Sequence, residues 1–211
     1  MNIAVIGANG KLGHKIVLEA KARGHYVKAV IHGDGEANEA DETLHKSLFN
    51  LNTSDIENID VIISAFGGGF KADPKINKEA LEKLADLVKG TSKRFISIGG
   101  AGMLYVDASH TSRVYQGKDH PDFLRGISEN ILLGVNELKT MKDVNFTVIC
   151  PSIFFDYEGK KTTNYKIGLN EEVLYSSKGE SRISYEDMAY AMIKEAEEHA
   201  FNQKCITICE E

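Results

Sequence analysis

The chain has 211 residues and a formal net charge of −6, from 25 Lys and Arg against 31 Asp and Glu. With 42% hydrophobic and 27% charged residues, the composition excludes a collagen-like or compositionally disordered chain and needs no disulfide scaffold. The acidic balance, without any run of basic residues, argues against nucleic acid as a partner.

The first elements form a β-α-β pattern. Residues 2–6 are a continuous apolar run, typical of a strand buried on both faces. A glycine turn follows at residues 7–13, and Leu12, Ile16, Val17 and Ala20 then recur at helical spacing up to Gly24. Residues 26–31 read as the next strand, and two parallel strands joined in this way require a right-handed crossover.

Strands and helices continue to alternate along the chain. The expected strands lie at 47–49, which is short, and at 60–66, 94–98, 145–150 and 204–208, while helices are expected at about 76–89, 122–141 and 185–199. The pattern predicts an α/β fold, a Rossmann-like doubly wound parallel sheet flanked by helices. We expect one domain, 1–211, in which residues 152–182, with strand-like pieces at 164–167 and 173–175, form a small C-terminal cap over the sheet edge.

The glycine turn is the strongest chemical signal in the sequence. Gly7, Gly10 and Gly13 directly follow a buried strand and open a helix, so they can form a sharp turn and let the main chain approach a pyrophosphate. Free N–H groups at the helix start favour the negative charge of that group. The spacing GxxGxxG differs from the usual GxGxxG of dinucleotide-binding proteins.

Further strings along the chain sharpen this interpretation. They are Ser97-Ile98-Gly99-Gly100-Ala101-Gly102, Cys150-Pro151-Ser152-Ile153-Phe154-Phe155 and Ser181-Arg182-Ile183-Ser184-Tyr185-Glu186-Asp187. With the glycine turn, they make the chain resemble the atypical short-chain dehydrogenases, and among them the NAD(P)-binding NADH-flavin reductase-like family, which is related to biliverdin reductase B and NmrA-like proteins. The resemblance spans essentially the whole chain.

The resemblance implies where a dinucleotide would bind. Gly7, Asn9, Gly10, Lys11 and Leu12 would surround the pyrophosphate and the adjoining ribose. Ala65, Phe66, Gly67 and Gly99 would lie along the cofactor edge, with Pro151 and Ile153 near the nicotinamide, and Asn50 and Leu51 near the adenine.

The residue that ends the second strand bears on the choice of cofactor. An acidic residue there binds the ribose of NAD, whereas a basic one accommodates the 2′-phosphate of NADP. This chain has His32, with Asp34 two positions further on. Both cofactors stay open, with NADP(H) slightly favoured over NAD(H).

A proton relay is the part of the usual machinery that the sequence lacks. Classical short-chain dehydrogenases place a Tyr, with a Lys four positions later, on the helix after the fifth strand. The expected helix at about 122–138 contains no Tyr. Tyr157 and Lys161 have the literal spacing but fall in a turn after the sixth strand, so we reject them as a catalytic pair. Tyr115, His110 and His120 are weaker candidates, in a loop on the cofactor side.

Neither the cysteines nor the histidines predict another kind of site. Cys150, Cys205 and Cys209 have no CxxC spacing or nearby His, so we expect buried reduced thiols, and no two of the seven His form a metal-binding pair. The chain has no apolar run of about 20 residues and no signal-peptide pattern at its start. We therefore expect a cytoplasmic protein without a membrane partner.

A site without a Tyr/Lys pair suits an acceptor that needs no strong acid. Ketone reduction leaves an alkoxide that needs a proton, whereas a flavin such as FMN or FAD, or a quinone, delocalises the charge of an added hydride. The sequence thus favours an NAD(P)H-dependent oxidoreductase with a small-molecule acceptor. The alternative is a non-catalytic NAD(P)-binding sensor of the NmrA-like kind, and an epimerase of nucleotide sugars is disfavoured.

Overall fold

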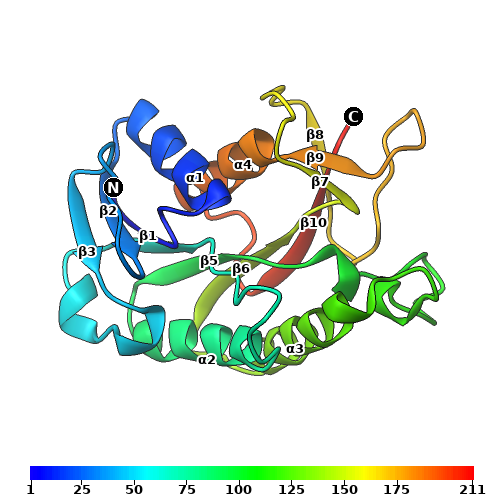
Figure 1. Cartoon of the computed structure of the whole chain (residues 1–211), viewed down its shortest axis with the longest axis horizontal. Coiled ribbons are helices and arrows are strands. Elements are labelled where there is room, and N and C mark those ends of the chain that lie inside the picture. The colour runs from blue at the N-terminus through cyan, green and yellow to red at the C-terminus, as the bar shows by residue number, and fades with distance from the viewer.

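A computed structural model describes all residues 1–211 and shows one large sheet between two helical layers (Figure 1). The strand order is β3-β2-β1-β4-β5-β6-β10-β8, parallel throughout except for β8, which runs antiparallel to β10. The strands of this sheet are β1 (Asn2–Ile6), β2 (Tyr26–Ile31), β3 (Glu42–His45), β4 (Val61–Ser64), β5 (Arg94–Ile98), β6 (Asn145–Cys150), β8 (Tyr165–Gly168) and β10 (Lys204–Glu210). The predicted Rossmann-like fold class is confirmed.

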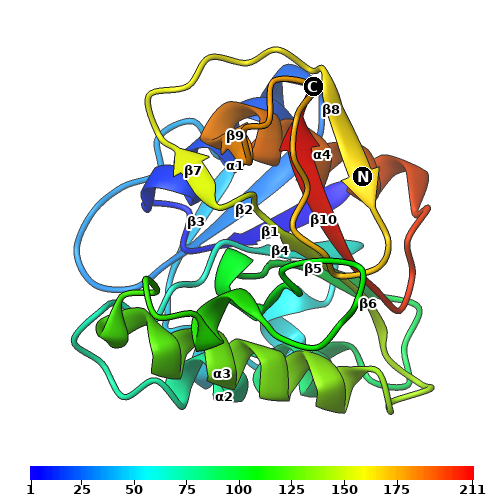
Figure 2. The ribbon, with the colours of Figure 1, turned by 90° about the vertical axis from the view of Figure 1, so that its right-hand side faces the viewer.

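Four α-helices cover the two faces of the sheet. They are α1 (Lys11–Ala22), α2 (Ile76–Val88), α3 (Asp122–Leu138) and α4 (Tyr185–Glu198). Helices α1 and α4 pack together on one face, and α2 and α3 on the other, as Figures 1 and 2 show. Each face has its own buried apolar cluster, because the central strands carry Val, Ile and Phe on both sides. None of these helices is both long and apolar enough to cross a membrane.

Short 3-10 helices occupy several of the connections. They are η1 (Leu48–Asn50), η2 (Thr53–Ile56), η3 (Ala101–Met103) and η4 (Val114–Gln116). The predicted strand at 47–49 is therefore wrong: Leu48 enters the core from η1, and the edge strand β3 lies earlier, at Glu42–His45. Because β3 is an exposed edge with polar residues, its apolar pattern is weak.

Residues 152–182 divide between two sheets. The expected strand piece at 164–167 appears as β8 and extends the main sheet, whereas 173–175 forms no strand. Strands β7 (Phe154–Asp156) and β9 (Arg182–Ser184) form a separate parallel pair beside α4 (Figure 2). The segment thus contributes a strand, β8, to the main sheet itself.

The start of α4 anchors the loop before β8. Ser184 Oγ accepts a hydrogen bond from the Asp187 amide at 2.9 Å and so caps the start of α4. The buried Asp187 carboxylate accepts the amides of Thr162 and Thr163, at 2.9 and 2.7 Å. The loop is therefore held against α4, close to where the carboxyl ends of the strands meet.

Candidate functional site

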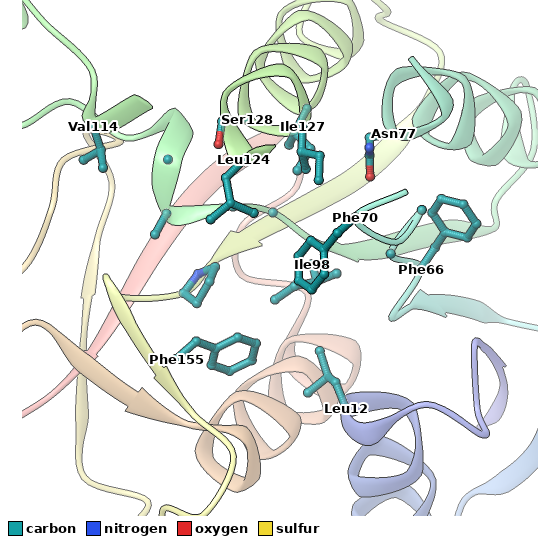
Figure 3. Close-up of a pocket in the computed structure, with 18 of the residues that line it drawn as sticks. Leu12, Phe66, Phe70, Asn77, Ile98, Val114, Leu124, Ile127, Ser128 and Phe155 are labelled. Atoms are coloured by element: carbon teal, nitrogen blue, oxygen red, sulfur yellow. The ribbon is translucent and has the colours of Figure 1, made fainter. Parts of the chain in front are cut away.

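A cavity of about 970 Å³ lies beyond the carboxyl ends of β4, β5 and β6. This is the edge at which open α/β sheets bind ligands, and the volume is at the upper end of the range for small-molecule sites. Figure 3 shows Leu12 and Phe155 on one side of the cavity and Asn77, Leu124 and Ser128 on the other. Most of its surface is apolar side chain or glycine main chain.

The glycine turn closes one end of the cavity. Gly7 has a φ of +72°, a conformation that favours glycine, and its amide donates to the Val30 carbonyl at 2.9 Å. A Cβ on Gly13 would lie 2.0 Å from the Gly7 carbonyl oxygen, so helix α1 can approach the turn only without a side chain there. No side chain caps the start of α1 and its first turn has no acidic residue. The turn therefore fits a pyrophosphate, which the free N–H groups of α1 would bind.

Most of the predicted cofactor residues line the cavity. They are Lys11, Leu12, Ala65, Phe66, Gly67, Gly99, Pro151 and Ile153. A Cβ on Gly99 would lie 2.5 Å from the Cys150 Sγ atom, so this glycine also lets β5 pack against β6.

The other predicted cofactor residues lie outside the cavity. Gly7 and Gly10 lie in the turn between β1 and α1. Asn9, His32 and Asn50 are exposed, near the ends of β1, β2 and η1 respectively. Leu51 is 1% exposed and packs in the core, which leaves only its main chain available to a ligand.

Tyr157 does not pair with Lys161, in agreement with the rejection of this motif. The Tyr157 ring lies under Lys11 Nζ, at 4.4 Å from its centroid, while Lys161 Nζ binds Glu19 at 2.5 Å. Tyr115 does not line the cavity. Helix α3, where the usual relay would lie, contains no Tyr.

Of the weaker sequence candidates, His120 lines the cavity and His110 does not, and Tyr185 and Ser128, which were not candidates, line it as well. The Tyr185 ring stacks on Phe155 at 3.9 Å between centroids, and burial raises the pKa of Tyr185, with a further contribution from Tyr157. On the opposite wall, His120 Nε2 lies 3.5 Å from Ser128 Oγ, and burial followed by Arg125 lowers the pKa of His120. The loop before α3 was expected on the cofactor side, but no sequence signal brings the start of α4 to the same cavity.

Comparison with known proteins assigns the family. The family model described as NAD(P)H-binding matches residues 7–199, nearly the whole chain. The chain belongs to the NAD(P)H-binding family. Its predicted place among atypical short-chain dehydrogenases that resemble NADH-flavin reductases is thereby confirmed.

Relatives of this NAD(P)H-binding protein match over their full length. YwnB of Bacillus subtilis is 33% identical, with 100% of this chain and 99% of YwnB covered. A solved Streptococcus pneumoniae protein, named "putative NADH-flavin reductase", is 33% identical with a TM-score of 0.92, and both chains are covered completely. ChuY of Escherichia coli, an anaerobilin reductase, shares the fold, with a TM-score of 0.74 at 17% identity over 100% of this chain and 97% of ChuY.

The remaining chemistry-bearing groups of this NAD(P)H-binding protein are structural or dispersed. All three cysteines are free and buried, as predicted. No three His, Cys, Asp or Glu side chains gather in a way that could hold a metal ion.

Proposed function

We propose that this protein is an NAD(P)H-dependent reductase that passes hydride to a flavin or another flat conjugated acceptor. The observation that carries the proposal is the single continuous cavity, which runs from the glycine turn to a second wall formed by η3, α3 and the loop before α3. Its volume of about 970 Å³ leaves space beyond the nicotinamide for a second ring system. The name of the Streptococcus pneumoniae relative supports the same reaction class.

We assign the cofactor to the edge that the family's glycine turn creates. The pyrophosphate and its ribose would contact Gly7, Asn9, Gly10, Lys11 and Leu12, and the adenine side would face His32, Asn50 and the Leu51 main chain. The nicotinamide end would lie among Ala65, Phe66, Gly67, Gly99, Pro151 and Ile153, all of which line the cavity.

The chain's own contribution is orientation and exclusion of water. A bound reduced nicotinamide supplies hydride from its C4 atom. The apolar walls, with Leu12 and Phe155 on one side and Leu124 on the other, hold two flat rings together and keep solvent out. Because α3 has no Tyr to act as an acid, the residues suit an acceptor that delocalises the added charge and takes its proton from water.

The end of β2 favours NADP(H) slightly over NAD(H). His32 is exposed there, and no acidic side chain occupies that position. We expect His32→Glu to weaken NADPH binding several-fold while leaving NADH binding unchanged or stronger, measured by titration of both cofactors. Equal effects on the two cofactors would contradict the assignment of His32 to the 2′ position.

The decisive experiment is steady-state oxidation of NADPH and NADH with FMN, FAD, menadione and biliverdin. We expect turnover that depends on both the acceptor and the protein, well above the uncatalysed background. Tight cofactor binding without turnover of any acceptor would instead support the alternative, a non-catalytic NAD(P)-binding sensor.

A further inference from the structure

Four of the polar side chains that line the cavity already have hydrogen-bond partners within the protein. Ser64 Oγ accepts a main-chain amide at 3.3 Å, while Ser97 Oγ and Ser152 Oγ donate to main-chain carbonyls at 3.2 and 2.8 Å. The Asn77 amide donates to another carbonyl at 3.0 Å. These groups stabilise the loops of the cavity and have reduced capacity for a ligand.

His120 and Ser128 differ from these groups. Their Nε2 and Oγ atoms lie 3.5 Å apart, beyond the normal range of about 2.7–3.2 Å, and neither atom has a closer partner. Ser128 is only 6% exposed, so its hydroxyl is largely withdrawn from bulk water. Two polar atoms are thus held side by side in an apolar wall with unused hydrogen-bonding capacity.

Gly102 makes room for this pair. A Cβ on Gly102 would lie 2.1 Å from Ser128 Oγ and 3.1 Å from His120 Cε1. Leu124 also lines the cavity, and Figure 3 shows Ser128 on the same wall as Leu124. The absent side chain therefore lets both polar atoms reach the cavity wall, opposite Phe155.

We propose that Ser128 and His120 together bind a carbonyl oxygen of the acceptor, which makes ring-carbonyl compounds such as flavins and quinones the substrate class. This inference rests on the proposed function. Two groups 3.5 Å apart can both lie within hydrogen-bonding distance of one oxygen placed between them. When hydride moves from the nicotinamide to the acceptor ring, negative charge grows on that oxygen, both hydrogen bonds strengthen, and water supplies the one proton that completes the reduction.

The test measures binding and turnover separately. FMN is titrated calorimetrically into the protein saturated with NADP⁺, and KM is measured for FMN and menadione with NADPH. We expect Ser128→Ala and His120→Leu to weaken FMN binding and raise both KM values about tenfold or more, with NADP⁺ affinity unchanged. His120→Gln, which keeps a donor, should restore most of the binding.

Two controls separate a polar contact from a general structural effect. Phenazine methosulfate accepts hydride but has no carbonyl, so its turnover, after subtraction of the uncatalysed reaction, should be the same in the wild type and the variants. His110→Gln changes a histidine that stacks on Tyr105 at 4.2 Å and does not line the cavity, and it should alter no constant. Ser128→Ala removes only one oxygen atom and should therefore fold, so it still tests the proposal if His120→Leu does not fold.

The outcomes distinguish this inference from the proposed function. If the wild type reduces FMN and menadione but the Ser128 and His120 variants stay within twofold in KM and FMN affinity, the carbonyl site is wrong and the reductase stands. If no acceptor is turned over but FMN binding still depends on Ser128, the reductase is wrong and the carbonyl site stands. Loss of phenazine turnover in parallel with FMN turnover would also overturn the carbonyl site.

Discussion

The glycine turn at residues 7–13 and the glycine run at residues 99–102 both follow a buried parallel strand, yet their glycines are needed for different reasons. In the turn, a side chain on Gly13 would meet the main chain of Gly7 at 2.0 Å. In the run, side chains on Gly99 and Gly102 would meet Cys150 Sγ and Ser128 Oγ, at 2.5 and 2.1 Å. The first segment shapes the backbone and the second makes space for side chains.

This difference teaches that a glycine-rich segment after a buried strand does not by itself tell how well its positions tolerate a side chain. A main-chain clash can be relieved only by moving α1 or β1, whereas a side-chain clash can be relieved by changing the neighbouring residue. Substitutions in the two segments should therefore differ in size of effect and in whether a second change repairs them.

The largest effect is expected for Gly13→Ala. The added methyl group would force the start of α1 away from the turn, so we expect the free energy of unfolding to fall by about 3 kcal/mol or more and cofactor binding to be lost. Chemical denaturation followed by circular dichroism measures the free energy of unfolding, and NADPH titration measures cofactor binding. A fall in the free energy of unfolding of less than about 1 kcal/mol would show that the turn can accommodate a side chain, and the contrast between the turn and the run at 99–102 would then be wrong.

Gly10→Val should separate binding from folding in the same turn. Gly10 has a φ of −79°, which other residues adopt, and a Cβ there would contact only the Gly7 carbonyl oxygen, at 3.1 Å. We expect a nearly unchanged unfolding midpoint but NADPH binding at least a hundredfold weaker, about 2.7 kcal/mol, because the side chain would occupy the pyrophosphate position. An unchanged cofactor titration would defeat the assignment of the glycine turn.

Gly99→Ala should destabilise the protein by about 1–3 kcal/mol through overpacking against Cys150 and Val148. Here a second change should repair the first. The double variant Gly99→Ala with Cys150→Ala should be more stable than the sum of the two single effects predicts, as measured in a double-mutant cycle. Strict additivity would mean that the run at 99–102 is constrained by its backbone, like the turn.

The smallest expected effect is a pH dependence of the free energy of unfolding that comes from His120, in the second wall of the cavity. Burial, followed by Arg125, lowers the pKa of His120 below its ordinary value of 6.5. The unfolded chain therefore takes up this proton at a higher pH than the folded chain does, and stability is lost as the pH falls from about 6.5 through the lowered pKa. Because glutamine does not titrate, the His120→Gln variant should not lose stability in this way as the pH falls.

The unfolding free energies of the wild type and His120→Gln, compared between pH 7.5 and 5, measure the effect. The variant should gain relative to the wild type as the pH falls. A constant difference across this range would show that His120 titrates as it does in the unfolded chain.

The sequence predicts the sheet well because its central strands are buried on both faces and read as continuous apolar runs. Val61–Ser64 is buried at every position, and its strand was expected within one or two residues at each end. The edge strand β3 has no such run, and Leu48, which was taken for part of a strand, reaches the core from a 3-10 turn instead. The pattern of apolar residues in the sequence therefore identifies the central strands of the sheet better than its edge strands.

The candidate site divides in the same way. Ala65, Gly99 and Pro151 follow strands, and parallel strands gather their carboxyl ends, so their meeting at one cavity could be predicted. Tyr185 and Ser128 lie on different helices, and the closeness of their elements to the cavity depends on how the helices pack. Local spacing carries no information of that kind, so of the second wall only His120 was among the sequence candidates, and its neighbour Ser128 was not.

The position of β8 has a consequence for biosynthesis. Its one partner in the main sheet is β10, which the ribosome makes only after the whole of α4. Until then Tyr165–Gly168 have no strand to join, and β6 presents one open edge with unpaired main-chain groups. A nascent chain paused before residue 204 would therefore be at its most vulnerable to mispairing with a neighbouring chain, although most of its sheet has already been synthesised.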